Sequence, residues 1–115
     1  MSSDCIFCKI AGGQLETELV YEDSEIVAFK DINPQAPVHL LIIPRRHVPS
    51  LLDLQEDDAD LAGRLLLTAN RLARTFKIDQ SGYRVLTNCG KDAGQAVSHL
   101  HLHLLGGRPL LQTMG

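Results

Sequence analysis

Short apolar runs bounded by turn residues occur in both halves of the chain, and each has the length of a β-strand. The runs at 18–23 and 25–31 meet at the turn signal Asp23-Ser24, which predicts a β-hairpin. Three further runs predict strands, at 39–43, 83–88 and 98–105. We therefore expect a sheet of about five strands.

A helical period occurs in one long segment and in one short segment. From about Asp57 to Phe76, apolar residues recur every three or four positions, which places them on one side of a long amphipathic helix. The segment CIFCKIAGG near the N-terminus predicts one or two helical turns that end at Gly12 and Gly13. Because strands lie on both sides of one long helix in the sequence, the pattern favours an α+β fold with an antiparallel sheet.

The composition is that of one globular domain, spanning residues 1–115. With 44% hydrophobic residues the chain can bury a core without disulfides. The formal net charge of −3 and the lack of a long basic run argue against nucleic acid as a partner. No segment approaches the ~20 apolar residues of a membrane span, and the N-terminus lacks a signal-peptide pattern. We expect a cytoplasmic protein with no membrane partner.

Three of the five histidines stand at every second position of the last predicted strand, with a leucine after each. In a strand, His99, His101 and His103 would share one face, while the leucines point into the core. A polar face built only from histidine is better explained by imidazole chemistry than by solvation. Imidazole can bind a metal, attack as a nucleophile or carry a proton near neutral pH.

A glycine-rich loop, NCGKDAGQ at 88–95, precedes the histidines. Its glycines allow main-chain amides to turn inward and cradle an anion, so a phosphate beside the histidines is the natural inference. A catalytic metal held by all three histidines is an alternative. Ligands at alternate positions of a flat strand would span ~13 Å, which one ion cannot easily bridge.

The segment GQAVSHLHLHLLGGRP resembles the signature of the histidine triad (HIT) proteins. The resemblance extends through DCIFCKI, VYEDSEIVAFKDINPQAPVHLLIIPRRH and TNCGKDAGQAV, and it is greatest to the Hint branch of compact, dimeric nucleotide hydrolases. It implies a HIT-like fold, a homodimer and a purine nucleotide substrate similar to AMP. The implied reaction is hydrolysis of nucleoside 5′-phosphoramidates, with dinucleoside polyphosphate hydrolysis as the nearest alternative in the superfamily.

The resemblance also implies roles for individual residues. His101 would attack the α-phosphorus and form a nucleotidyl-imidazole, with its Nδ1 proton donated to a main-chain carbonyl. His103 would hold a phosphate oxygen, and His39 would support the triad by hydrogen bonding. Asp31 would accept hydrogen bonds from the ribose hydroxyls. The implied nucleotide-binding set is Ile6, Phe7, Phe29, Asp31, Ile32, Asn88, Gly94, Gln95, Ala96, Val97 and His103, with Ile10 and Leu41 as further apolar neighbours.

The pair Cys5 and Cys8 has the spacing of half a zinc site. In a reducing compartment a metal or simple packing explains it better than a disulfide. Some bacterial HIT proteins, which this chain resembles, complete the site with the histidine after IIPRR and the first triad histidine, here His47 and His99. Four protein ligands would make the Zn²⁺ structural. Cys89 has no evident partner in the sequence.

Two departures from the Hint pattern affect the expected activity. Where these proteins commonly have a serine beside the leaving group, this chain has Ala96, and Ser98 or Thr87 is the nearest possible substitute. The C-terminal GGRPLLQTMG also differs from the aromatic, proline-rich tail of many members. A nucleotide-binding or scaffold protein with weak activity is therefore a third hypothesis.

Overall fold

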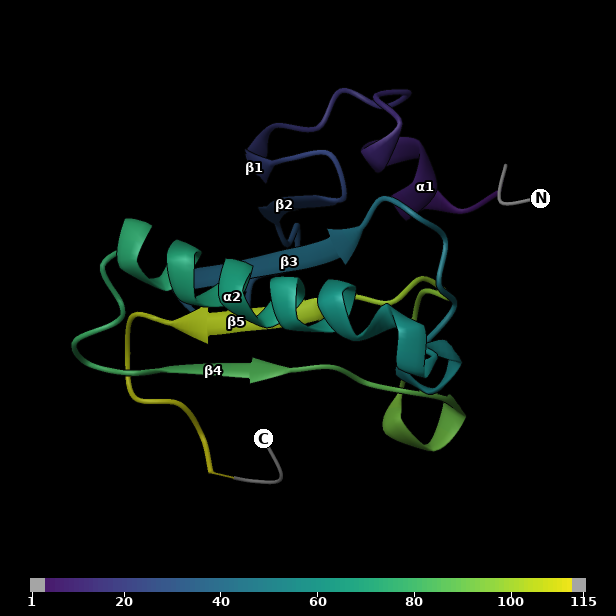
Figure 1. Ribbon diagram of the computed structural model, residues 1–115. Coiled ribbons are helices and arrows are strands. Elements are labelled where there is room, and N and C mark those ends of the chain that lie inside the picture. Colours follow the sequence, from purple (N-terminus) through teal and green to yellow (C-terminus); the bar gives the residue numbers. More distant parts are fainter. Residues whose placement is uncertain (1–3, 113–115) are drawn as a thin grey trace.

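The computed structural model describes residues 4–112. Two helices and five strands follow one another in the order that the sequence pattern predicts (Figure 1). They are α1 (Ile6–Ala11), β1 (Leu19–Glu22), β2 (Ile26–Lys30), β3 (Val38–Pro44), α2 (Ala59–Thr75), β4 (Tyr83–Leu86) and β5 (Leu102–Gly106). Short 3-10 turns at Leu51–Asp53, Glu56–Asp58 and Lys91–Ala93 lie in the connections.

The five strands form one antiparallel sheet in the order β1-β2-β3-β5-β4. The predicted hairpin is confirmed as β1 and β2, and β5 inserts between β3 and β4. This insertion pairs Leu41 with His103 and His39 with Leu105, so residues from the middle of the chain lie beside the last strand. The predicted α+β class and antiparallel sheet are therefore confirmed.

The two faces of the sheet bury different parts of the chain. The long helix α2 lies across one face (Figure 1), and alternate strand residues such as Leu40, Ile42 and Leu104 pack there with Leu65 and Leu72. The other face is covered in part by α1. The cluster on that face consists of Phe7, Ile10, Ala11, Val27, Phe29, Leu41 and Ile43. Because side chains alternate along a strand, His39 and His103 fall on the α1 face.

The long helix begins two residues later than the apolar period suggests. The Asp58 carboxylate accepts a hydrogen bond from the Gln55 amide at 2.8 Å, and Glu56–Asp58 forms a 3-10 turn before α2 starts at Ala59. Leu61, Leu65, Ala69 and Leu72 are all buried, as expected. Within residues 4–112, no helix is long and apolar enough to cross a membrane.

The last strand is shorter than predicted, and this changes the setting of the histidines. The ladder of β5 begins at Leu102, so His99 and His101 lie in the segment just before it. There the Leu100 amide donates to the Val48 carbonyl at 2.7 Å, a contact outside the regular ladder. The leucines still point into the α2-side core, with Leu100 2% and Leu104 0% exposed. The alternation of side chains between the two faces therefore continues before Leu102, although the β5 ladder does not extend there.

Candidate active site and metal centre

His101 lines a cleft on the α1 face of the sheet, with only 6% of its surface exposed. Its Nδ1 is 2.7 Å from the main-chain carbonyl oxygen of His99. A carbonyl oxygen only accepts hydrogen bonds, so Nδ1 carries the proton and Nε2 keeps its lone pair. The geometry thus selects the tautomer in which Nε2 has an unprotonated lone pair.

The hydrogen bond with His39 selects the opposite tautomer of His103. The Gln35 amide donates to Nδ1 of His39 at 3.0 Å, so a neutral His39 carries its proton on Nε2. This Nε2 is 2.9 Å from Nδ1 of His103, which therefore accepts. The remaining ring nitrogen of His103, Nε2, then carries a proton and is a donor. Two adjacent triad histidines thus offer one lone pair and one N–H.

Both supporting histidines are held in the neutral form near neutral pH. Burial lowers the pKa of His103 to about 4, helped by the nearby His101 and His39 rings and opposed by the Asp31 carboxylate. Burial also lowers the pKa of His39, against the effect of Asp31, whose Oδ2 is 3.4 Å from His39 Nε2. The hydrogen-bond chain deduced for neutral rings is therefore consistent with the electrostatics.

The cleft has a volume of about 430 Å³ and is lined by both apolar and polar side chains. Predicted residues that line it are Ile6, Phe7, Ile10, Phe29, Asp31, Ile32, Leu41, Asn88, Gly94, Ala96, Val97, His101 and His103. Leu15, Thr17 and Lys30 line it as well and were missed by the sequence reasoning. Nothing in the apolar pattern distinguishes them. Leu15 and Thr17 lie in the segment between α1 and β1, and Lys30 is the last residue of β2.

Gln95 is the one predicted nucleotide-binding residue that does not line the cleft. Its Nε2 donates to the carbonyls of Pro49 and Val97 at 2.7 and 2.9 Å, and its Oε1 accepts from the Gly90 amide at 2.9 Å. The Gln95 side chain therefore stabilises the glycine-rich loop through hydrogen bonds to main-chain groups. Gly90 and Gly94 have φ of 89° and 78°, so the same loop depends on glycine at both turns.

Neither hydroxyl that could replace a serine at position 96 lies in the cleft. Thr87 donates to the His101 carbonyl at 2.8 Å and lines a groove on the α2 side of the sheet. Ser98 does not line the cleft but borders an adjoining hollow with Cys5 and His47, which shares Ile6, Ala96 and Val97 with the cleft. Ala96 itself lines the cleft, so the missing hydroxyl is not supplied by these two residues.

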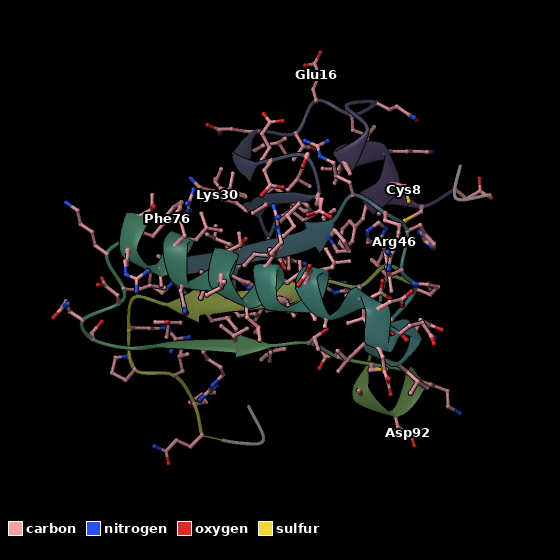
Figure 2. The ribbon with its side chains drawn as sticks, viewed as in Figure 1. Cys8, Glu16, Lys30, Arg46, Phe76 and Asp92 are labelled. Carbon is pink, nitrogen blue, oxygen red and sulfur yellow. The ribbon has the colours of Figure 1, made fainter. Side chains whose placement is uncertain are left out.

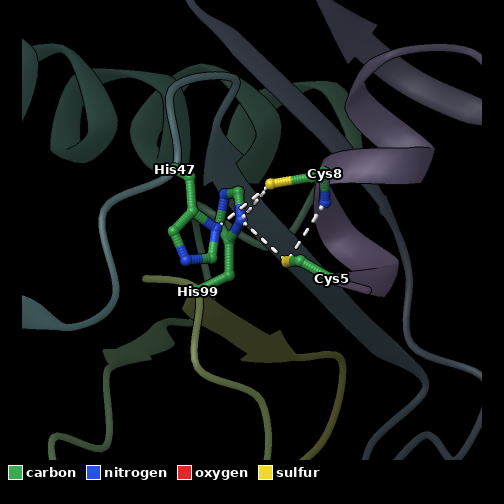
Figure 3. A group of neighbouring side chains, drawn as sticks. All are labelled: Cys5, Cys8, His47 and His99. Atoms are coloured by element: carbon green, nitrogen blue, oxygen red, sulfur yellow. Dashed lines mark hydrogen bonds between the residues drawn. The ribbon is translucent and has the colours of Figure 1, made fainter. Parts of the chain in front are cut away.

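A second group of side chains lies at the end of β3, where α1 meets the segment before β5 (Figure 3). Cys5 and Cys8 come from the start of α1, and their sulfur atoms are 3.3 and 3.4 Å from Nδ1 of His99. The Cys8 sulfur is also 3.1 Å from Nδ1 of His47, so Cys8 lies close to the segment that carries Arg46 in Figure 2. The predicted four-residue set is therefore assembled in space.

The chemistry of this cluster fits a zinc ion. The four potential ligand atoms all lie within 4.8 Å of one another, as ligands around a single ion would. The Nε2 of His99 is 2.8 Å from the Pro44 carbonyl oxygen, so Nε2 carries the proton and Nδ1 turns its lone pair toward the thiols. Cys89 is not part of the cluster. Two thiolates and two imidazoles form a closed, structural type of site.

Asp31, His39 and His103 also lie close enough together to hold an ion. Their facing atoms are already engaged with one another, since His39 Nε2 is 2.9 Å from His103 Nδ1. The side chains of the three triad histidines thus have three different surroundings. His99 faces the thiols, His101 faces the cleft, and His103 joins His39. A single ion shared by all three does not match this arrangement.

Known proteins resemble this chain over nearly its whole length. A model of the HIT domain matches residues 12–110. The purine nucleoside phosphoramidase of Escherichia coli (strain K12) is 41% identical over 110 residues, which cover 96% of this chain and 92% of that protein. A HIT family hydrolase from Legionella pneumophila has a similar structure, with a TM-score of 0.94, 46% identity, and coverage of 96% of this chain and 99% of the other. A histidine triad protein from Clostridium difficile has a TM-score of 0.93, 44% identity and 96% coverage of both chains. The chain therefore belongs to the HIT family.

Proposed function

We propose that this protein hydrolyses nucleoside 5′-phosphoramidates through a nucleotidyl intermediate on His101. The observation that carries the proposal is the hydrogen bond from His101 Nδ1 to the His99 carbonyl, because it leaves a nucleophilic Nε2 in a ring that lines the cleft. The similarity to a phosphoramidase at 41% identity supports the same reaction.

The reaction divides one displacement into two. His101 Nε2 forms a bond to the α-phosphorus while the P–N bond breaks, and the amine leaves after taking a proton from the surrounding water. Water then attacks the phosphorus, the P–Nε2 bond breaks, and a proton returns to the solvent with the nucleotide as product. In both steps the Nε2–H of His103, the Asn88 amide and the loop at 94–97 stabilise the charged phosphate oxygens.

The cleft suits a purine nucleotide. Its apolar lining, which includes Ile6, Phe7 and Phe29, can receive a base. Edge-to-face aromatic packing at 5.5 Å between Phe7 and Phe29 gives this lining a defined shape. Asp31 lies along the same cleft and supplies carboxylate oxygen for the ribose hydroxyls. Base, sugar and phosphate would then lie in sequence toward His101.

A fluorogenic adenosine phosphoramidate tests the proposal directly. Wild-type protein should release the fluorophore, and His101→Ala should abolish turnover while AMP binding stays within roughly an order of magnitude, because His101 is the nucleophile rather than the main binding surface. His101→Ala that retains turnover would refute the mechanism. Parallel reactions with diadenosine tetraphosphate would show whether the polyphosphate is the better substrate.

We further propose that Cys5, Cys8, His47 and His99 hold a structural Zn²⁺. Bound there, the ion would fasten α1 to the segment before β5, so that its binding free energy contributes to folding. Elemental analysis should find one zinc per chain, and Cys8→Ser should lower both the zinc content and the melting temperature. Protein that contains no zinc, and whose melting temperature does not rise when zinc is added, would contradict this assignment.

We also propose a homodimer assembled through α2 and β4. The strand β4 is at the edge of the sheet, where main-chain groups are available to a second strand. Leu66 and Leu67 on α2 are 55% and 64% exposed, and an apolar groove of about 220 Å³ runs between α2 and β4. A two-fold arrangement would cover both features at once.

A further inference from the structure

His99 is connected to three parts of the site at once, and it is completely buried. Its Nδ1 faces the two cysteine sulfurs, and its Nε2–H donates to the Pro44 carbonyl at 2.8 Å. Its own carbonyl accepts the Nδ1–H of His101 at 2.7 Å. The same residue therefore belongs to the metal centre through its side chain and to the nucleophile through its main chain.

The His99 carbonyl is not held in place by the sheet. The β5 ladder begins at Leu102, three residues further on. The nearest main-chain contact of this segment is the bond from Leu100 to the Val48 carbonyl at 2.7 Å, and Val48 directly follows the ligand His47. Orientation of the carbonyl that selects the His101 tautomer thus depends on the His99 ring and on the segment around the metal centre.

A second connection runs through α1. Phe7, which lies between Cys5 and Cys8 in the chain, packs edge-to-face against the His101 ring at 5.1 Å and against the His99 ring at 5.9 Å. With six residues, α1 is too short to be a stable helix by itself. A metal that binds both cysteines would hold this helix, and with it Phe7, against the nucleophile.

We propose that His99 is a positioning residue through which metal occupancy controls the orientation and tautomer of His101. The inference rests on the proposed function, which makes His101 the nucleophile. Without the ion, the buried Nδ1 of His99 and the thiols lose their common partner, so the ring and its carbonyl are held by fewer contacts, chiefly the bonds to the Pro44 and Val48 carbonyls. A displacement of about 1 Å at a reacting group can reduce the rate by about 100-fold.

His47 offers the cleanest way to remove the metal, because it is an exposed ligand outside both α1 and the triad. His47→Ala should lower zinc affinity and, in its zinc-free form, reduce kcat about 10- to 100-fold with a smaller change in KM. Its ¹⁵N spectrum should lose the Nδ1–H signature of His101. His47→Cys keeps a zinc ligand and should restore zinc content, spectrum and kcat together.

Leu61→Ala is the matched control for lost stability, since Leu61 packs on the opposite face of the sheet. It should lower the melting temperature while kcat and the His101 spectrum stay as in the wild type. A folded, zinc-free His47→Ala protein with wild-type kcat and an unchanged His101 signal would overturn the proposal, as would a wild-type protein that binds no zinc.

The spectrum separates this inference from the proposed function. If zinc-loaded wild type fails to hydrolyse the phosphoramidate, the function is wrong, but the coupling is still decided by the His101 signal with and without zinc. A signal that changes on zinc removal supports the coupling, and one that stays the same refutes it.

Discussion

Two substitutions of His39 can separate its two hydrogen bonds. Asparagine places an amide oxygen near the position of Nδ1, where it can still accept from the Gln35 amide, but it cannot reach His103. Glutamine extends to the position of Nε2 and can still donate to His103 Nδ1, but it leaves the Gln35 amide without its present acceptor. In the wild type these bonds measure 3.0 and 2.9 Å.

The expected magnitudes follow from burial. His39 is 6% exposed, so each lost partner should cost about 1–3 kcal/mol of stability, and both variants should melt at a lower temperature. Only His39→Asn removes the donor that keeps the proton on Nε2 of His103. If ~1.4–2.7 kcal/mol of that bond is needed in the transition state, its rate should fall about 10- to 100-fold.

Steady-state rates with the fluorogenic phosphoramidate, measured well below both melting temperatures, test whether the donor to His103 contributes to the reaction. We expect His39→Gln to keep kcat near that of the wild type and His39→Asn to lose it, although their stabilities are similar. Equal losses of kcat in the two variants would refute the tautomer argument, because the donor to His103 would then have no separate effect on the reaction.

Three further predictions concern pH, the leaving group and assembly. Burial lowers the pKa of His103 to about 4, whereas a histidine in the unfolded chain has a pKa of about 6.5. Between these two values the unfolded chain binds more protons, so the free energy of unfolding should fall as the pH drops from about 6.5 to 4. Denaturation curves that coincide at pH 7 and 4.5 would contradict this. Ala96→Ser adds a hydroxyl to the cleft and should raise kcat for substrates with poor leaving groups, with no gain for good ones, as rates across a leaving-group series would reveal. Leu66→Glu together with Leu67→Glu should convert a dimer into a monomer in sedimentation at micromolar protein, whereas a wild type that is monomeric there would exclude the proposed dimer.

The sequence determined much of this fold because its local signals agree with one another. The apolar period of the long helix and the turn at Asp23-Ser24 act over short distances, and both were confirmed. The alternation around the triad also held, because each leucine gains free energy by burial whether or not the strand ladder includes it. Boundaries that differed by two residues or more, such as those at Ala59, Leu86 and Leu102, depend on hydrogen bonds that no apolar pattern encodes.

Only the tertiary structure decided what each histidine contacts. His99, His101 and His103 are equivalent in the alternating pattern, yet the side-chain partners of His99 and His103 come from distant segments, whereas His101 bonds to the carbonyl of His99 in its own segment. Cys5 is 94 positions from His99 in the chain, and His39 is 64 positions from His103. The tautomer of each ring is set by the acceptor or donor that faces it. A carbonyl oxygen requires a proton on the facing nitrogen, whereas in this fold the thiols and the second imidazole face a nitrogen lone pair. The family resemblance implied a cluster of His99 with the cysteines and a pairing of His39 with the triad, but residue spacing alone could not, because contacts between distant segments exist only after the sheet has formed.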